Sequence, residues 1–599
     1  MPNQTLTAFR ESARAQAAQY LEDFPAGGFS RLKEDQLPEK KLNVAAWKGN
    51  IPCGDEPVEI IIALPISFPD ELPNIYLPNP PTVLPHMTAT RENHICYANS
   101  QEVFSLPERP AEIIKDALRM AGETISGGLT GDNKQDFIQE FEAYWADHDE
   151  AQKWISLLKP GGKPRAIARL ALGKTIDRAN SLFGENEEQC IKWLGNTGTD
   201  INKPDCHENL YLPLREAFIP PFPSKNNEIY RLLSEIDQEA LAVLCNFLTK
   251  HKKRLANYVL FSVPIGNHYA FGGWEHSRPR KKKRNEVICP GFRDDRVTGE
   301  VQLKTCFPYQ PIIRASIRRA DPVRLQARVG SIRGANLLQK TVLLIGCGSI
   351  GCRIANLLSL GGVGELLLAD DDIYGIDNLA RHILPAEFLG DKKADSLAIM
   401  LKAQSPHLEA EPYHQDFYKV MATQPEVIIK ADLVLAATGN RNLEFRLNSL
   451  LNNEDKPRPA IYAWTEARGI GSHALLTVPG RGGCLRCAFK TEENNDIRFK
   501  YAVDTRLASE VSISEEGCGT TFQPFSALVA EQAALIASEM ALAYLHGNLG
   551  VSSRWHYLGD LNAAKNEGIH ISERYKRYSG DELLRSSFPR HQDCPECKR

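Results

Sequence analysis

Three glycines in the second half of the chain have the spacing of a phosphate-binding turn. Gly346, Gly348 and Gly351 form a G-x-G-x-x-G pattern that follows the apolar run KTVLLIG and opens the helical pattern GSIGCRIANLLSL. Backbone amides in such a turn can approach a phosphate, which the N-terminus of the helix favours electrostatically. Asp370 comes 24 residues after Gly346, at the end of the next apolar run, where an acid accepts from a ribose hydroxyl. The pattern predicts nucleotide binding, and a tight turn without a ligand is the alternative.

Four cysteines form two C-x-x-C pairs, Cys484 with Cys487 and Cys594 with Cys597. Each pair can hold one edge of a tetrahedral site, and four thiolates complete a closed structural zinc (Zn2+) site. The second pair lies near the end of the sequence, where a metal would hold the terminal segment to its domain. The alternative is a redox C-x-x-C motif, which would not explain two copies.

A further cysteine, Cys518, stands between glycines in EEGCGTTFQPF, shortly before a long apolar helical pattern. A thiol in this polar setting is expected to be exposed and near a helix N-terminus, and both conditions favour the reactive thiolate. We therefore predict a nucleophile at Cys518, with a structural cysteine in a loop as the alternative. Cys347 and Cys352 lie in the glycine turn and the helix start, where we expect them to be packing residues.

The elements around these residues predict a parallel sheet. From about residue 316 the apolar runs KTVLLIG, GELLLADDD and ADLVLAAT alternate with helical patterns, and a long helix is predicted in PFSALVAEQAALIASEMALAYL. Strand–helix–strand alternation is typical of an α/β domain in which helices cover a parallel sheet. We assign this domain to residues 316–599.

The N-terminal part has a different pattern. Residues 5–24 have the apolar spacing of a helix, and the runs KLNVAAWKG and VEIIIALPI predict strands. The proline-rich passage 68–85 predicts irregular surface chain or a sheet edge, because proline lacks a donor and fixes its own backbone angle. Helical patterns follow, and we assign residues 1–150 to this first domain.

Residues 151–315 are interpreted as a connector whose fold the sequence does not predict. The region contains helical stretches and a basic run, RPRKKKR (278–284). A charge run of this kind is most simply a solvated loop. A nuclear signal or nucleic-acid patch is the alternative, and no other feature of the sequence favours it.

The composition limits the class of protein. The chain has 599 residues, of which 42% are hydrophobic and 24% are charged, an ordinary globular balance. A formal charge of −4 gives no support to nucleic-acid binding through phosphate attraction. No apolar stretch reaches the roughly 18 residues that a membrane span needs. The charged N-terminal sequence is unlike a signal peptide, so we expect a cytoplasmic protein with reduced thiols.

The passage ADDDIYGIDNLARHILPAEFLGDKKAD resembles the ubiquitin-activating superfamily, whose ThiF-like adenylating domain also occurs in molybdopterin- and thiamine-pathway activators. The resemblance covers roughly 325–599 and implies a Rossmann-like fold that binds ATP with Mg2+. Cations there would offset phosphate charge as pyrophosphate leaves, and surface cations are the alternative. The resemblance assigns Asp370 and Asp372 to the ribose and metal region. It assigns Asn378, Arg381 and Lys393 to the triphosphate.

The sequence departs from this family at two places. The family often has Thr-Asp-Asn after the fourth strand, with the aspartate helping to hold magnesium, whereas this chain has Gly439 at that position. Asp370 or Asp372 could compensate. The family also uses an arginine upstream of the glycine turn, sometimes from the other protomer, and the candidates here are Arg324, Arg328 and Arg333.

The proline-rich FPDELPNIYLPNP followed by HICYANS resembles a ubiquitin-conjugating domain, which implies an α+β fold with Cys96 as acyl carrier. The His-Pro-Asn triplet of such domains is not present as such, and only Pro85-His86 and Asn93-His94 lie nearby. His94 could orient a nucleophile or stabilise the thiolate, but a lone histidine is more often structural. In the activating family, the region of Cys518 carries the cysteine that takes the acyl group from the adenylate, and the paired C-x-x-C motifs also occur.

A conjugating-like domain ahead of an activating-like domain resembles the bacterial fusion found in CBASS antiphage systems. That resemblance implies that ATP adenylates the C-terminal carboxylate of a cGAS-like nucleotidyltransferase. The acyl group would pass to Cys518 as a thioester, then to Cys96, and then to a target protein or small-molecule amine. We also expect a homodimer, because activating domains of this kind usually pair.

Three other interpretations stay open. A sulfur-carrier-protein adenylyltransferase would use the same adenylation but not Cys96. An NAD-dependent oxidoreductase would use the glycine turn but leave Arg381, Cys518 and the cysteine pairs unexplained. A scaffold would bind ATP without turnover.

Overall fold

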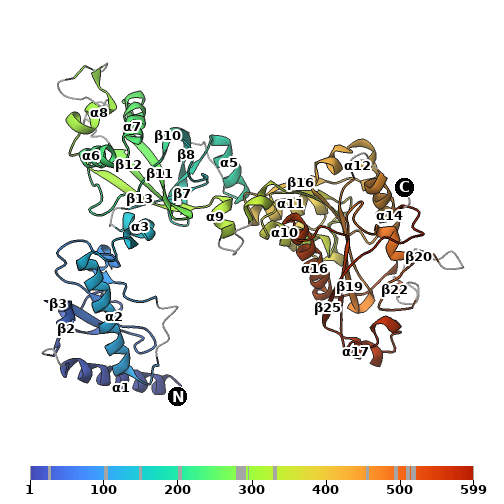
Figure 1. Cartoon of the computed structure of the whole chain (residues 1–599), viewed down its shortest axis with the longest axis horizontal. Coiled ribbons are helices and arrows are strands. Elements are labelled where there is room, and N and C mark those ends of the chain that lie inside the picture. The colour runs from blue at the N-terminus through green and yellow to red at the C-terminus, as the bar shows by residue number, and fades with distance from the viewer. Residues whose placement is uncertain are drawn as a thin grey trace. The chain divides into compact units, whose positions relative to one another are not determined.

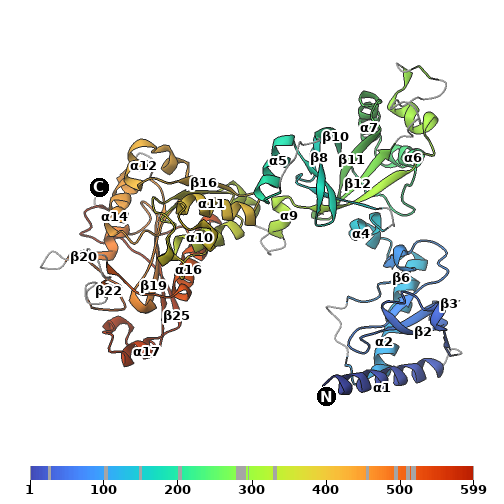
Figure 2. The same cartoon turned by 180° about the vertical axis from the view of Figure 1, so that it is seen from behind.

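The computed structural model describes residues 2–24, 28–54, 56–99, 106–147, 151–199, 206–277, 292–293, 296–327, 334–453, 457–491, 497–506, 513–514 and 521–597 (Figure 1; seen from behind in Figure 2). The chain divides into two compact units. The first contains residues 1–190 and 204–320, and the second contains residues 191–203 and 321–599.

The first unit begins with an antiparallel sheet covered by two long helices, seen in blue in Figure 1. Its strand order is β1-β2-β3-β4-β6-β5. The first helix buries Ala13, Ala17 and Leu21, whose four-residue spacing places them on one face. The elements are α1 (Pro2–Glu22), β1 (Ser30–Arg31), β2 (Asn43–Cys53), β3 (Glu56–Pro65), β4 (Asn74–Tyr76), β5 (Met87–Thr88), β6 (His94–Ile95), α2 (Pro110–Thr130), α3 (Asp136–Gln139) and α4 (Phe141–Trp145).

The proline-rich passage is more ordered than the sequence predicts. Asn74, Ile75 and Tyr76 form β4, which pairs with β3 on one side and with β6 on the other. Ile75 and Tyr76 are buried. This stretch contains no proline, so its amides can donate within the sheet. The expectation of irregular surface or edge chain is therefore wrong for these three residues.

The region without a predicted fold forms a closed barrel of order β10-β11-β12-β13-β7-β9-β8. Its wall packs on an aromatic cluster in which Trp145, at the end of α4, stacks on Phe218 and donates from Nε1 to Gly273 O at 3.0 Å. The elements are β7 (Gln152–Ser156), β8 (Arg165–Ile176), β9 (Ala179–Gly184), α5 (Glu187–Asn196), β10 (Cys206–Pro213), α6 (Asn226–Ile236), α7 (Gln238–Lys250), β11 (Ala256–Ile265), β12 (His268–Ser277), α8 (Gly299–Val301) and β13 (Ile312–Arg319).

The second unit is built on a sheet of order β16-β15-β14-β17-β18-β19-β24-β25. The first five strands are parallel, as the alternating pattern predicts, and the last three add antiparallel pairs. The strands are β14 (Thr341–Ile345), β15 (Glu365–Ala369), β16 (Glu409–Tyr413), β17 (Leu433–Ala436), β18 (Ala460–Thr465), β19 (Gly471–Thr477), β24 (Ser553–Leu558) and β25 (Glu582–Ser587). Short pairs outside this sheet are β20 (Phe489–Thr491) with β21 (Ile497–Phe499), and β22 (Ile513–Ser514) with β23 (Thr521–Phe522).

Helices cover both faces of this sheet. Along β14, Val342 and Leu344 pack into one hydrophobic layer while Leu343 and Ile345 pack into the other, which explains the continuous apolar run. The first layer contains α10 (Gly351–Leu360), α11 (Lys393–Gln404) and α16 (Ala527–Leu545), and the second contains α12 (Phe417–Thr423), α13 (Glu426–Lys430) and α14 (Arg441–Asn453). Two further helices of this unit are α9 (Pro322–Ala327) and α17 (Leu561–Asn566).

Among the described residues, α16 alone is long and apolar enough to cross a membrane by length and composition. Its Ala534, Ala537 and Ala541 are buried in the layer that also holds α10. Core helices pass the same test, so this finding is weak evidence for a membrane span.

Candidate functional sites

A cavity of about 780 Å³ lies in the second unit where two parallel strands end. Residues 348–350 after β14 and residues 437–439 after β17 line it. The strand order continues from β14 to β15 on one side and to β17 on the other, so the chain reverses direction across the sheet here. Ligands of open α/β sheets bind at such a switch point. We call this space the nucleotide cavity.

The glycine turn lies beside the nucleotide cavity, and two of its glycines are needed for close packing. Gly346 has φ +90°, and a Cβ there would lie 2.7 Å from Ala437 O. A Cβ on Gly351 would lie 1.8 Å from Gly346 O. Gly348 has no such neighbour and lines the cavity. Its open backbone is the part of the turn that a phosphate could approach.

Asp370 holds the glycine turn from behind. Its Oδ2 accepts from Cys347 N at 2.6 Å, and its Oδ1 accepts from Asp372 N at 2.9 Å. Burial raises the pKa of the Asp370 carboxyl, and the two amide bonds oppose that change. Cys347 is fully buried, as the sequence predicts for a packing residue, and so is Cys352. Asp370 does not line the cavity, so its predicted bond to ribose stays a prediction.

The other predicted residues divide between the cavity and its surroundings. Lys393 is buried and its Nζ lies 2.8 Å from Asp372 Oδ2. The Oδ1 of Asn378 accepts from Gly375 N at 3.0 Å, so this side chain closes its own turn. Arg381 lines the cavity, with its guanidinium 5.3 Å from the centre of the Phe525 ring. Of the predicted triphosphate residues, Arg381 is thus the one at the cavity wall.

A buried arginine that the sequence analysis did not single out positions this wall. The Nη1 of Arg353 donates to Ser349 O at 2.8 Å and to Arg381 O. Its Nε lies 2.8 Å from Glu531 Oε2 on α16. Arg353 therefore joins the glycine turn, the Arg381 backbone and α16. Its place on the inner face of α10 was the available signal, because a charged residue in an apolar helix face needs a partner.

A second cation at the cavity was also missed. Arg441 begins α14, lines the cavity and lies 2.6 Å from Glu444 through Nη1 and Oε2. Its guanidinium is 4.6 Å from the Trp464 ring centre. Burial raises the pKa of Glu444 and the Arg441 cation opposes it. The signal was positional, because Arg441 comes just after a parallel strand that ends at the cavity.

The residues after that strand support the predicted departure at Gly439. Gly439 lines the cavity and has no side-chain oxygen to offer a metal. Asn440 uses its Oδ1 to accept from Leu443 N at 3.1 Å, which caps α14. The aspartates Asp370, Asp371 and Asp372 bring their oxygens within 4.8 Å of one another, on the other side of the glycine turn.

Glu466 anchors the chain segment that leads toward Cys518. Its Oε1 accepts from Val503 N and its Oε2 accepts from Asp504 N, both at 2.8 Å. Its Oε1 also lies 2.7 Å from Nε2 of the buried His473. Cys518 itself lies outside the described residues, as do Arg328, Arg333 and the basic run 278–284. Arg324 is described, in α9.

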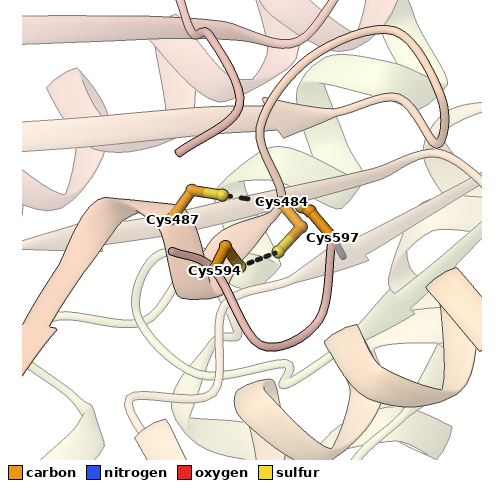
Figure 3. A group of neighbouring side chains, drawn as sticks. All are labelled: Cys484, Cys487, Cys594 and Cys597. Atoms are coloured by element: carbon orange, nitrogen blue, oxygen red, sulfur yellow. Dashed lines mark hydrogen bonds between the residues drawn. The ribbon is translucent and has the colours of Figure 1, made fainter. Parts of the chain in front are cut away.

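The four cysteines of the two C-x-x-C pairs meet in space (Figure 3). Cys484 Sγ is 3.7 Å from Cys594 Sγ, and Cys487 Sγ is 3.5 Å from Cys597 Sγ. Tetrahedral zinc with Zn–S bonds of about 2.3 Å separates its sulfurs by roughly 3.8 Å. The Cys484 thiol and the His591 amide donate to Cys487 Sγ, which lowers the pKa of the Cys487 thiol.

Cys96 is exposed and comes directly after β6 in the first unit. Its N donates to His86 O at 2.7 Å, which extends the pairing of β5 with β6. Partial burial and the negative charge of Glu140 raise the pKa of the Cys96 thiol, whereas the Arg91 cation acts to lower it. The thiol is therefore accessible without being strongly activated.

His94 is a poor candidate for proton transfer. Burial and the nearby Arg91 cation lower the pKa of His94 to about 4, so the ring is neutral at neutral pH. Its ring packs edge-on against the buried Tyr76, with the ring centres 5.4 Å apart. These contacts favour the structural alternative for His94.

Family comparisons agree with the division into two kinds of domain. Residues 324–577 match the ThiF family, and residues 28–153 match the Prokaryotic E2 family B. The chain is a fused E2-like and E1-like conjugating enzyme that uses ATP. ThiF adenylation implies ATP with Mg2+. The E1-like domain holds the nucleotide cavity, and the E2-like domain holds Cys96.

Two relatives match this fused enzyme over most of its length, and both are named ATP-dependent ubiquitin transferase-like protein Cap2. The Escherichia coli (strain TW11681) protein is 25% identical over 90% of this chain and 88% of its own. The Vibrio cholerae protein is 27% identical over 80% of this chain and 82% of its own. The structure of E. coli MccB with ATP aligns with 44% of this chain and 68% of its own at 20% identity, with a TM-score of 0.33.

Proposed function

We propose that this enzyme ligates the C-terminus of a protein to an amine through two successive thioesters. A carboxylate oxygen of the substrate attacks the α-phosphorus of ATP, and pyrophosphate leaves. The thiolate of Cys518 then attacks the acyl carbon and AMP leaves. Exchange with the Cys96 thiol moves the acyl group to the E2-like domain, where an amine displaces Cys96 and forms an amide. A cGAS-like nucleotidyltransferase is the proposed protein substrate, as the resemblance to the CBASS fusion implies.

One observation carries this proposal: an exposed thiol on an E2-like hairpin belongs to the same chain as a nucleotide cavity lined by arginines. Adenylation builds negative charge on the leaving pyrophosphate, and fixed cations stabilise that charge in the transition state. Arg381 and Arg441 supply such cations at the cavity. The exposed Cys96 then provides the acceptor that adenylation alone would not need.

The magnesium that accompanies ATP needs oxygen ligands from the protein, substrate phosphates or water. Gly439 does not fit the role that aspartate has in the family, because it has no side-chain oxygen. Asp370 and Asp372 have the right donor type beside the glycine turn, although both already bind protein groups. We therefore propose that they serve the metal together with the phosphates.

We also propose that Cys484, Cys487, Cys594 and Cys597 hold a structural Zn2+. The donor set is four thiols, the sulfur separations match those of a tetrahedral site, and an amide donates to one sulfur. The ion would join the segment after β25 to the turn between β19 and β20. We propose that the enzyme is cytoplasmic and forms a homodimer. Light scattering of the purified enzyme would measure its oligomeric state.

A gel separates the steps. ATP and the nucleotidyltransferase are incubated with wild type, Cys518→Ala, Cys96→Ala and the control Cys306→Ala, and run with and without reducing agent. We expect Cys518→Ala to abolish every reducible adduct. Cys96→Ala should keep the Cys518 adduct and lose the final conjugate, and the control should behave as wild type. A conjugate that forms at the wild-type rate in Cys96→Ala would contradict the proposal.

That outcome would instead favour a sulfur-carrier-protein adenylyltransferase, which needs adenylation but not Cys96. An NAD-dependent oxidoreductase is the third possibility, and a binding assay that prefers NAD over ATP would favour it. The exposed thiol and the cavity arginines are unused in that reaction, so the observations above favour ligation.

A further inference from the structure

Four polar side chains are grouped around His86, whose carbonyl accepts from Cys96 N, and have no role in the transfer steps above. They are His86, Asp136, Glu140 and Tyr144, and we call them the His86 group. Their side chains come from two places, the start of the β5–β6 hairpin and the α3–α4 segment about 50 residues later along the chain.

Strand register places His86 opposite Cys96. In the hairpin Met87 pairs with Ile95, and the bond from Cys96 N to His86 O continues the same register by one step. Met87 and Ile95 are buried. The backbone pairing therefore brings His86 and Cys96 together at the end of the hairpin. Glu140, whose carboxylate lies 3.5 Å from the His86 ring, also acts electrostatically on the Cys96 thiol.

The imidazole of His86 is hydrogen-bonded to one carboxylate and lies near a second. Its Nε2 lies 2.9 Å from Asp136 Oδ2, a hydrogen-bond distance, whereas its Nδ1 lies 3.5 Å from Glu140 Oε2. In a neutral ring, a proton on Nε2 would donate to Asp136 and the lone pair would be on Nδ1. An imidazole oriented by a carboxylate on its far nitrogen is the arrangement of a general base.

The backbone of His86 is also constrained. Its φ is +61°, a region that residues with a side chain rarely occupy, and its amide donates to Tyr144 Oη at 2.5 Å. Tyr144 Oη in turn donates to Glu140 Oε2 at 2.9 Å. The hydroxyl thus connects the His86 backbone to the carboxylate beside its ring. The charge of Glu140 reaches the Cys96 sulfur, since it contributes to the raised pKa of that thiol after burial.

We propose that His86 is the base that takes the proton of the acceptor amine when this amine attacks an acyl thioester on Cys96. Asp136 positions the ring, and Glu140 attracts the positively charged acceptor. The inference rests on the proposed role of Cys96 as acyl carrier. In this chain His86 would take the place of the His-Pro-Asn triplet that the E2-like sequence lacks.

The step balances without a further reactant. The nitrogen lone pair of the amine forms a bond to the acyl carbon, and one N–H proton passes to Nδ1 of His86. The carbon–sulfur bond breaks and its electron pair stays on Cys96 Sγ. The imidazolium can then return the proton to that thiolate. Two carboxylates that are 30% and 48% exposed favour a basic primary amine, such as a lysine side chain, as acceptor.

A single-turnover discharge assay tests this step on the full-length enzyme. Wild type and His86→Gln are loaded with ATP and the nucleotidyltransferase, ATP is removed with apyrase, and free lysine is added. We expect His86→Gln to form the Cys96 thioester normally and to discharge it about 100-fold more slowly, the usual range for a lost general base. Added imidazole should restore part of the rate.

Two further variants separate roles within the His86 group. Asp136→Asn should discharge the thioester about 10-fold more slowly because it keeps the base and loses only its orientation. His94→Gln, whose ring lies in the same hairpin, is the matched control and should discharge at the wild-type rate.

Three outcomes overturn the proposal. If His86→Gln discharges the thioester at the wild-type rate, His86 is not the base. Equal loss of loading and discharge with no rescue by imidazole, together with a lower melting temperature, assigns His86 a structural role. Absence of a Cys96 thioester in wild type refutes the carrier role and this inference together, and the gel described above identifies that case.

Discussion

The two reactive centres of this enzyme are built in different ways. In the E1-like domain the nucleotide cavity lies at the ends of β14 and β17, and short stretches directly after those strands line it. In the E2-like domain the residue paired with Cys96 belongs to the His86 group, which combines a hairpin with a helical segment far along the chain. The wall after β14 and β17 follows from local chain order, whereas the His86 group depends on how distant segments pack.

The centres also differ in exposure. Arg353 and Lys393, which organise the E1-like site, are buried, although their partners Glu531 and Asp372 are more than half exposed. Cys96 is exposed and His86 is partly exposed. A small nucleotide can be enclosed, whereas an acyl acceptor on another protein needs an open surface. The difference predicts that single substitutions act more strongly in the E1-like domain.

The largest effect is expected at Arg381. Arg381→Ala removes a cation from the cavity wall, and loss of one charge-stabilising group typically costs about 100-fold or more in rate. ATP–pyrophosphate exchange in the presence of the protein substrate measures it. Arg585→Ala, at an exposed pair with Glu539, is the control and should exchange normally. Wild-type exchange by Arg381→Ala would break the contrast between the two domains.

The next effect concerns the cysteine cluster. Cys594→Ser should lower bound zinc from one ion per chain to none and lower the melting temperature, because zinc binding contributes to folding. Elemental analysis and a thermal melt measure both results. Cys306 lies outside the cluster, so Cys306→Ser should keep its metal. Unchanged zinc in Cys594→Ser would show that the four thiols are not its ligands.

A smaller, pH-dependent effect is expected at His94. The folded-state pKa of His94, about 4, lies below the ordinary value of 6.5. Between these pH values His94 binds a proton in the unfolded chain but not in the folded chain. Stability is therefore lost as pH falls from 6.5 toward 4. His94→Gln should reduce the fall in melting temperature between those pH values. The exposed His268 provides the control, since His268→Gln should keep the wild-type slope; an unchanged slope in His94→Gln would be the contrary result.

The smallest effect is expected at an exposed helix pair of the E2-like domain. Arg119 Nη1 lies 2.9 Å from Glu123 Oε1 on α2, with both side chains more than half exposed. Water and salt screen such pairs, so Arg119→Ala should change the free energy of unfolding by less than about 0.5 kcal/mol. Denaturant unfolding measures the change. A loss of several kcal/mol in the free energy of unfolding would contradict the expectation that substitutions of exposed side chains in this domain have small effects.

Much of the E1-like fold was readable because its signals are local. The run KTVLLIG became β14, and the parallel order of the first five strands follows the alternating pattern. The cavity wall was only partly readable, because Arg353 and Arg441 act through partners that periodicity does not reveal. In the first unit, β4 and the closed barrel were missed, since proline content and weak periodicity hid strands whose partners are distant.

The sequence by itself determined the glycine turn, the parallel strands around it and the two C-x-x-C pairs, because each depends on neighbours a few residues apart. Tertiary packing alone brings together the four cysteines of two distant pairs and places the His86 ring within hydrogen-bonding distance of Asp136. Those encounters depend on strand register and helix packing, which arise from burial of apolar surface over the whole domain. The spacing of residues along the chain does not predict these contacts.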